Sequence, residues 1–160
     1  MKELQASLDG TGRSFALVVS RFNESVTEGL IAGARRCLLQ HGVDQDAIDL
    51  VRVPGAWELP GAVQRVVDTG RYDGVIALGC VIRGETPHFD YIAGAAINGL
   101  GGIASSAPVP VTMGLLTTET PEQALARSGG KSGNKGWDAA LAVLEMAALF
   151  QLLKVAGEGT

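Results

Sequence analysis

Cysteine and histidine are scarce in this chain, which holds two of each among its 160 residues. Cys37 and Cys80 fall in an expected helix and an expected strand, and neither belongs to a C-x-x-C pair. This pattern argues against a disulfide framework and favours buried free thiols in a reducing compartment, so we expect a cytoplasmic protein. His41 and His88 stand far apart in the chain. Because a metal site needs clustered ligands, the sequence predicts none.

Charge is also low, with charged residues making up 19% of the chain against 46% for hydrophobic residues. The net charge is −4 and no basic cluster occurs, which argues against nucleic-acid binding through phosphate neutralisation. The low charge content indicates surfaces buried between copies of the chain, although a monomer rich in small residues stays open. We expect no apolar run long enough to span a bilayer and no signal-peptide core at the N-terminus, hence no membrane partner.

Apolar runs alternate with stretches of helical spacing along the whole chain. We expect strands at residues 15–19, 49–53, 75–78 and 109–116, and helices at 25–40, 60–68, 92–104, 121–127 and 137–155, with a glycine-rich loop at 129–136. Strands that alternate with helices predict a three-layer α/β/α sandwich with a parallel sheet. We expect one domain at 15–160 behind an N-terminal arm at 1–14, and a flavodoxin-like strand order of 2-1-3-4.

Segment 79–91, with the sequence GCVIRGETPHFDY, is the most informative part of the chain. It places a cation, a glycine, an acid, a hydroxyl and one of the two histidines between a buried strand and a helix. Open α/β sheets bind ligands at this position, and the free N–H groups of a helix start attract anions. A solvated turn with a surface histidine is the alternative, although loops carry function more often than cores do.

The predicted strand order brings the loops that follow three strands to one sheet edge. These loops hold Phe22, Glu58 and His88, so we expect the three to lie close together. A nucleotide cofactor has no support, because the loose G-x-G-x-x-A match at 99–104 falls inside an expected helix.

Five motifs, taken together, resemble the lumazine synthase family. They are SRFNE at 20–24, PGAWELP at 54–60, segment 79–91, GLLTT at 114–118 and KSGNKG at 131–136, in family order over nearly the whole chain. The resemblance implies a transferase that condenses 5-amino-6-(ribitylamino)uracil with 3,4-dihydroxy-2-butanone 4-phosphate. The products are 6,7-dimethyl-8-ribityllumazine, phosphate and water, in the penultimate step of riboflavin biosynthesis. The family uses neither a metal nor an organic cofactor.

The resemblance also implies roles for residues of the predicted loops. Phe22 corresponds to the aromatic residue that stacks on the pyrimidine, a role that an exposed ring can perform. The positions expected to hold the ribityl chain and the polar groups of the ring are Asn23, Ala56, Trp57 and Glu58. Those expected to read the pyrimidine edge through their backbone are Val81 and Ile82, and those of the phosphate-side turn are Gly84, Glu85 and Thr86.

His88 resembles the family's proton-shuttling histidine, and Arg127 resembles its phosphate-binding arginine, so both are candidate catalytic residues. Lys135 matches a family position facing the site. Met113 departs from the family, where this position is often aromatic and covers the pyrimidine from a neighbouring subunit. Methionine can still form an apolar wall. Without the family context, Arg127 and Lys135 would be ordinary solvated charges.

The resemblance further implies active sites shared between subunits. The family forms homopentamers, and some members assemble twelve of them into an icosahedral shell of 60 subunits, with riboflavin synthase as a candidate partner. We expect the arm at 1–14 to add a strand to a neighbour's sheet edge. Two alternatives stay open: a non-catalytic flavin or lumazine binder, and a structural shell protein. Both are disfavoured by the joint presence of the candidate catalytic and phosphate-side residues.

Overall fold

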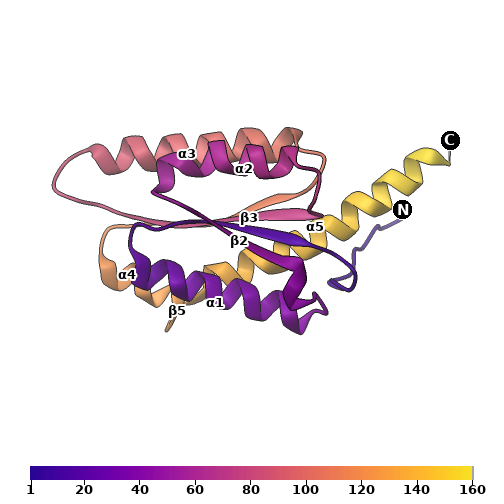
Figure 1. Ribbon diagram of the computed structural model, residues 1–160, viewed down its shortest axis with the longest axis horizontal. Coiled ribbons are helices and arrows are strands. Elements are labelled where there is room, and N and C mark those ends of the chain that lie inside the picture. The colour runs from indigo at the N-terminus through magenta and orange to yellow at the C-terminus, as the bar shows by residue number, and fades with distance from the viewer. Residues whose placement is uncertain (160) are drawn as a thin grey trace.

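The structure, a computed structural model, describes residues 1–159 and confirms a three-layer α/β/α sandwich (Figure 1). Within these residues, the main sheet holds four parallel strands in the order β2-β1-β3-β4, as predicted. The strands are β1 (Phe15–Ser20), β2 (Ile48–Val53), β3 (Gly74–Ile82) and β4 (Val111–Thr118). Helices α2 (Leu59–Asp68) and α3 (His88–Ser106) cover one face, and α1 (Glu24–Gln40), α4 (Pro121–Ala126) and α5 (Lys135–Glu158) cover the other. Two 3₁₀ turns, η1 (Gln45–Ala47) and η2 (Ala56–Glu58), flank β2.

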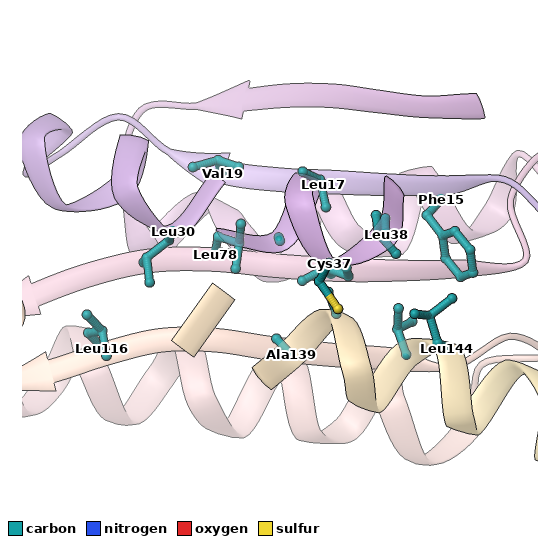
Figure 2. Packing of buried hydrophobic residues seen from close by; sticks show 14 of the residues in the cluster. Phe15, Leu17, Val19, Leu30, Cys37, Leu38, Leu78, Leu116, Ala139 and Leu144 are labelled. Carbon is teal, nitrogen blue, oxygen red and sulfur yellow. The ribbon is translucent and has the colours of Figure 1, made fainter. Parts of the chain in front are cut away.

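Strand β1 lies at the centre of the fold, and all of its residues are buried. Successive side chains of a strand point to opposite faces. Phe15, Leu17 and Val19 therefore join the cluster formed with α1 and α5, whereas Ala16 and Val18 join the cluster beneath α2 and α3. Figure 2 shows side chains of β1, α1 and α5 meeting in the first cluster, with the Cys37 sulfur among them. A parallel strand covered on both faces explains why its sequence is continuously apolar.

Strand β3 is longer than predicted, because it continues through Gly79 and Cys80 to Ile82. Gly79 suggested a loop, but its absent side chain serves packing. A Cβ at this position would lie 2.7 Å from Ser20 Oγ and 2.9 Å from Leu115 Cδ1. Helix α3 also begins earlier than predicted, at His88 rather than at Ile92. The loop between the two elements therefore shrinks to residues 83–87.

The predicted glycine-rich loop contains a small antiparallel hairpin, β5 (Ser128–Gly130) and β6 (Gly133–Asn134). Gly129 and Gly133 have φ values of 115° and 87°, which glycine adopts without the cost borne by other residues. Asn134 then caps α5, because its side-chain oxygen accepts from the N–H groups of Gly136 at 2.8 Å and Trp137 at 3.1 Å. This cap starts the helix at Lys135, two residues earlier than expected.

Helix α5 contradicts the expectation that no segment is long enough to cross a membrane, because its 24 residues suffice by length and composition. Its first half lies in the core, where Ala139, Val143 and Leu144 pack against the sheet and α1. Beyond Phe150 every described residue of the helix is exposed, and Figure 1 shows this end extending past the sheet. The contacts of the first half are those of a helix laid on a sheet, which explains that part of its apolar sequence.

The N-terminal arm forms no strand within residues 1–14 of the single chain. It is anchored at buried Gly10, whose N–H donates to the carbonyl oxygen of His41 at 2.7 Å. The hydroxyl of Ser14 donates to the carbonyl oxygen of Arg71 at 3.0 Å. The predicted pairing of the arm with a neighbour's sheet stays a prediction.

Candidate active site

A cavity of about 330 Å³ opens where β1 and β3 end. We call it the strand-end cavity. It is lined by residues from the loops after β1 and β2, from the end of β3 and the loop that follows it, and from the first turns of α3: Phe22, Asn23, Gly55, Ala56, Trp57, Cys80, Val81, Ile82, Gly84, Thr86, His88, Phe89 and Ile92. The predicted convergence of three loops at one sheet edge is therefore confirmed. Parallel strands produce it because all their carboxyl ends lie on the same side.

Hydrogen bonds hold the three loops in register. Asn23 adopts a left-handed conformation with φ 62°, which asparagine tolerates better than most residues. Its side-chain nitrogen donates to the Cys80 carbonyl oxygen at 3.0 Å, which ties the loop after β1 to β3. The N–H of Arg21 donates to the carbonyl oxygen of Val53 at 2.8 Å, which ties the same loop to β2.

Two aromatic side chains stand exposed at this cavity. Phe22 is 72% exposed and Trp57 is 64% exposed, whereas Ala56, which directly precedes Trp57 in the chain, is buried. A large ring left in water costs hydrophobic free energy, so two such rings beside one cavity indicate a surface that another molecule covers. The Phe22 ring is therefore free to stack on another molecule and is not folded onto the core.

His88 is the first residue of α3, and both His88 and Thr86 line the strand-end cavity. Its lining contains neither lysine nor arginine. Polar groups at this end of the cavity are thus a hydroxyl, an imidazole and the N-terminal N–H groups of a helix of 19 residues. Such a set can exchange protons and attract an anion, but it cannot neutralise a phosphate dianion alone.

Two acidic candidates lie outside the lining of this cavity. Glu58 is exposed, and its carboxylate accepts from the Gly55 N–H at 3.0 Å, which stabilises the turn η2. Glu85 is exposed in the loop before α3. The backbone of Gly84 does not adopt a left-handed conformation, and a Cβ there would meet no atom within 4 Å. The fold of the single chain therefore does not require glycine at position 84.

A second cavity, of about 370 Å³, lies along β4 beside α4 and the start of α5. We call it the edge cavity, because β4 is the last strand of the sheet. Met113, Arg127 and Lys135 line it together with residues of β4 and Gln123. The guanidinium of Arg127 donates through Nη1 to the carbonyl oxygen of Gln123 at 2.9 Å, and Lys135 Nζ lies 3.3 Å from an oxygen of Asp138.

The fourteen candidate site residues thus divide into groups. Nine line the strand-end cavity, three line the edge cavity, and Glu58 and Glu85 line neither. His88 and Arg127 belong to different cavities of one chain. A site that uses both groups therefore cannot be built from the strand-end cavity of a single chain.

Several lining residues were missed by the sequence reasoning. Phe89 and Ile92 face the cavity because α3 starts at His88, which places Ile92 one turn below the imidazole. The signal was the aromatic and apolar spacing after His88, which is that of a helix face.

Cys80 was predicted correctly as a buried thiol, and burial raises its pKa to about 11. Within the described part of the chain, no three His, Cys, Asp or Glu side chains are grouped as a metal site needs.

The chain matches known proteins over nearly its whole length. A family model described as 6,7-dimethyl-8-ribityllumazine synthase matches residues 12–151. A protein of that name from Gemmatimonas aurantiaca is 54% identical over 150 residues, covering 94% of this chain and 92% of the relative. One from Salinibacter ruber is 52% identical, with 94% and 97% covered, and one from Chlorobaculum tepidum is 47% identical, with 96% and 99% covered.

Proposed function

The chain belongs to the 6,7-dimethyl-8-ribityllumazine synthase family, and we propose that its active site forms between two copies of the chain. The reaction, a step of riboflavin biosynthesis, joins 5-amino-6-(ribitylamino)uracil to 3,4-dihydroxy-2-butanone 4-phosphate. In this proposal the strand-end cavity of one copy meets the edge cavity of the next. Such a head-to-tail contact uses two different surfaces and closes into a ring when the rotation between copies permits.

The observation that carries this proposal is the complementary chemistry of the two cavities. The strand-end cavity offers exposed aromatic rings and an imidazole but no lysine or arginine. The edge cavity holds Arg127 and Lys135 but no aromatic residue or histidine. One substrate is flat and heterocyclic, and the other carries a phosphate. A flat ring suits the first cavity, and a phosphate suits the planar fork of an arginine in the second.

The pyrimidine substrate lies in the strand-end cavity. Phe22 stacks on its ring, and the backbone groups of Val81 and Ile82 pair with its edge. Asn23, Ala56, Trp57 and Glu58 contact the ribityl chain. Asn23 uses its amide nitrogen on Cys80, which leaves its carbonyl oxygen as an acceptor for a hydroxyl. Glu58 binds Gly55 through one carboxylate oxygen, and the second can accept from the sugar-like tail.

The phosphate substrate binds on the other side, where the turn formed by Gly84, Glu85 and Thr86 meets the neighbour's Arg127. The open space around Gly84 lets the phosphate approach the backbone. Arg127 supplies the fixed fork and Lys135 a second positive charge, while Met113 covers the pyrimidine with an apolar wall. Neither a metal nor an organic cofactor takes part.

His88 moves protons between the reacting atoms. The uracil amine attacks the ketone carbon, and loss of water gives an imine. Phosphate is then eliminated, the ribitylamino nitrogen closes the ring, and a second water departs. These steps need a group that donates and accepts protons near neutral pH, which imidazole does. Holding the two substrates together contributes more to the rate, since effective molarities reach about 10⁵ M or beyond.

Mixing variants with damage in opposite cavities tests the shared site. Phe22→Asp damages the strand-end cavity and Arg127→Met the edge cavity, and each alone should have about a tenth of wild-type activity or less when the phosphate substrate is kept below its wild-type KM. Random co-assembly should restore about a quarter of wild-type activity, because one intact cavity of each kind then meets at about a quarter of contacts. Lumazine fluorescence and phosphate release are the readouts. A mixture no more active than its components would place the whole site within one chain.

The same assay distinguishes the alternative functions. A flavin or lumazine binder would bind product without releasing phosphate, and a shell protein would do neither. The proposed assembly is a homopentamer, with the compact hairpin at 128–134 favouring the icosahedral shell of 60 subunits and residues 1–14 pairing with a neighbour's sheet. Light scattering decides between pentamer and shell. The proposal also places the protein in the cytoplasm, with riboflavin synthase as a partner.

A further inference from the structure

The guanidinium of Arg83 makes contacts in three directions. Nη1 and Nη2 donate to the two carboxylate oxygens of Asp90 at 3.3 and 3.0 Å. Nε lies 2.8 Å from an oxygen of Glu119, and the guanidinium carbon lies 4.6 Å from the centre of the Phe89 ring. The backbone N–H of Arg83 also donates to the carbonyl oxygen of Thr118 at 2.9 Å. Arg83 therefore ties the first turn of α3 to the end of β4.

An isolated surface ion pair contributes little, but this arrangement differs from one. The pair with Asp90 is bidentate, and the fork is held by a second carboxylate and an aromatic ring, which together restrict its orientation. The side chain of Arg83 is 38% exposed and those of Asp90 and Glu119 are 57% and 60% exposed, so the restriction comes from the number and geometry of the contacts and not from burial. The orientation of Phe89 and Asp90 is consequently fixed by one neighbour.

The first turn of α3, like those of α1 and α2, lacks a side-chain cap, so the contacts of Arg83 are the side-chain contacts that restrain it. Its N-cap is Pro87, which accepts no hydrogen bond through its side chain. Helix α5, by contrast, is capped by Asn134, and α4 by Thr120. The first turn of α3 carries His88, Phe89 and Asp90 in sequence, so a bond to Asp90 and a contact with Phe89 restrain the backbone that presents the imidazole.

We infer that Arg83 is a positioning residue, which holds His88 in its reactive orientation by clamping the first turn of α3 against β4. Arg83 does not line the strand-end cavity, and its effect reaches the reaction only through this turn. The inference rests on the proposed proton-transfer role of His88. It predicts that a change at Arg83 lowers kcat more than it raises KM, because the residues proposed to bind the two substrates are themselves unchanged.

The test compares kcat and KM for Arg83→Met, Arg83→Lys and wild type. A misplacement of about 1 Å can cost about 10²-fold in rate, so we expect Arg83→Met to lower kcat by about 10- to 10²-fold. Each KM should change by less than about threefold. Arg83→Lys keeps the charge and loses the fork, so its kcat should fall between the other two. Asp90→Asn removes one arm of the clamp and serves as the second variant if Arg83→Met does not fold.

A matched control exists at the opposite end of the sheet. Arg71 also pairs with a carboxylate, that of Asp49 at 3.4 Å, and lies 5.3 Å from the ring centre of Tyr72. It contacts neither cavity. Arg71→Met should therefore leave both kcat and KM at their wild-type values, although it removes the same kinds of interaction.

Combining each change with His88→Ala separates positioning from a general structural effect. If Arg83 acts through the imidazole, Arg83→Met should lower kcat by less than about twofold when His88 is already absent. Two results would overturn the inference. One is that Arg83→Met lowers kcat by the same factor whether or not His88 is present, and the other is that Arg83→Met leaves kcat unchanged in the enzyme that retains His88. Wild-type activity of His88→Ala alone would instead remove the proposed role of His88, and with it this inference.

Discussion

The two cavities of the chain differ in how the sheet builds them. The strand-end cavity lies at the ends of central strands that are buried on both faces, so its side chains come from the end of β3, from the loops after the strands and from the first turns of α3. The edge cavity lies along β4, an outer strand whose flank is open to a neighbour. The central region therefore supplies a shaped apolar pocket with an imidazole, whereas the outer region supplies the cationic side chains of Arg127 and Lys135. Each chain carries two chemically opposite halves of the proposed site.

Exposed apolar groups occur in both regions. Phe22 and Trp57 stand at the strand-end cavity, and Met113, which is 45% exposed, stands at the edge cavity. Exposed apolar residues gathered at two surfaces, of which only one carries cationic side chains, fit a contact between copies better than they fit an isolated chain. Changing one region at a time tests whether the two cavities contribute different functions to one site.

Loss of the imidazole should have the largest effect. We expect His88→Ala to lower kcat by about 10²- to 10⁴-fold, the usual contribution of a positioned proton-transfer group. The variant should keep measurable activity, because the edge cavity and the aromatic rings of the strand-end cavity still hold the two substrates together. Steady-state kinetics with lumazine fluorescence measures this. A folded His88→Ala variant with no activity above the uncatalysed rate would contradict this division of work between the regions.

The thiol of Cys80, which lines the strand-end cavity, should react slowly with alkylating reagents in the ligand-free protein. Burial raises the pKa of the Cys80 thiol from 9.0 to about 11, so its reactive thiolate is scarce at pH 8. We expect alkylation of Cys80 by iodoacetamide at pH 8 to be about 10²-fold slower than in the urea-unfolded chain. The rate should rise about tenfold per pH unit up to about pH 11, since the thiolate fraction rises with pH. Peptide mass spectrometry follows the modification, and equal rates in folded and unfolded protein would show an open wall.

Removing the guanidinium from the edge cavity should weaken one substrate selectively. We expect Arg127→Met to raise KM for the phosphate substrate by about 10- to 10²-fold, the usual contribution of hydrogen bonds to a charged group. KM for the pyrimidine should change little, because that ring lies in the other region. Arg71→Met is the control for loss of a positive charge. An equal rise of both KM values would show that Arg127 serves the assembly rather than the phosphate.

An aromatic side chain at the edge cavity should give the smallest change. We expect Met113→Phe to bind the pyrimidine substrate about 2- to 10-fold more tightly, because a ring adds about 0.5 to 1.5 kcal/mol of aromatic pairing. Met113→Leu keeps an apolar wall without a ring and should bind as wild type does. Fluorescence titration measures both. Tighter binding by Leu as well as by Phe would attribute the gain to packing and not to stacking.

The predicted elements agree with the structure wherever the local pattern and the tertiary packing act in the same direction. Strand β1 is the clearest case, since a central parallel strand requires the apolar run that its sequence shows. Gly79 led to a wrong prediction of the end of β3, because glycine occurs both in turns and where elements pack closely. The closeness of Ser20 and Leu115 shows that Gly79 is a packing position. The start of α3 was predicted at the wrong residue because its N-cap is Pro87. Proline provides no side-chain cap, so the sequence carried no capping signal before His88.

The candidate site was predicted in composition but not in arrangement. The loops after β1, β2 and β3 were placed together correctly, because parallel strands end on one side. Arg83 received no role, since its partners Asp90 and Glu119 lie 7 and 36 residues away and only the first is on the same segment. Glu58 was assigned to the site, and its hydrogen bond to Gly55 shows that it also shapes its own turn.

By itself the sequence determined the layers of the fold, the order of its strands and the family to which the chain is similar. These follow from periodicity and from motifs that are read within a few residues of one another. Only the tertiary structure decided that His88 and Arg127 line separate cavities, that Gly79 is a packing position and that Arg83 clamps α3 to β4. Such facts depend on contacts between residues distant in the chain, and no local pattern encodes a distance in space.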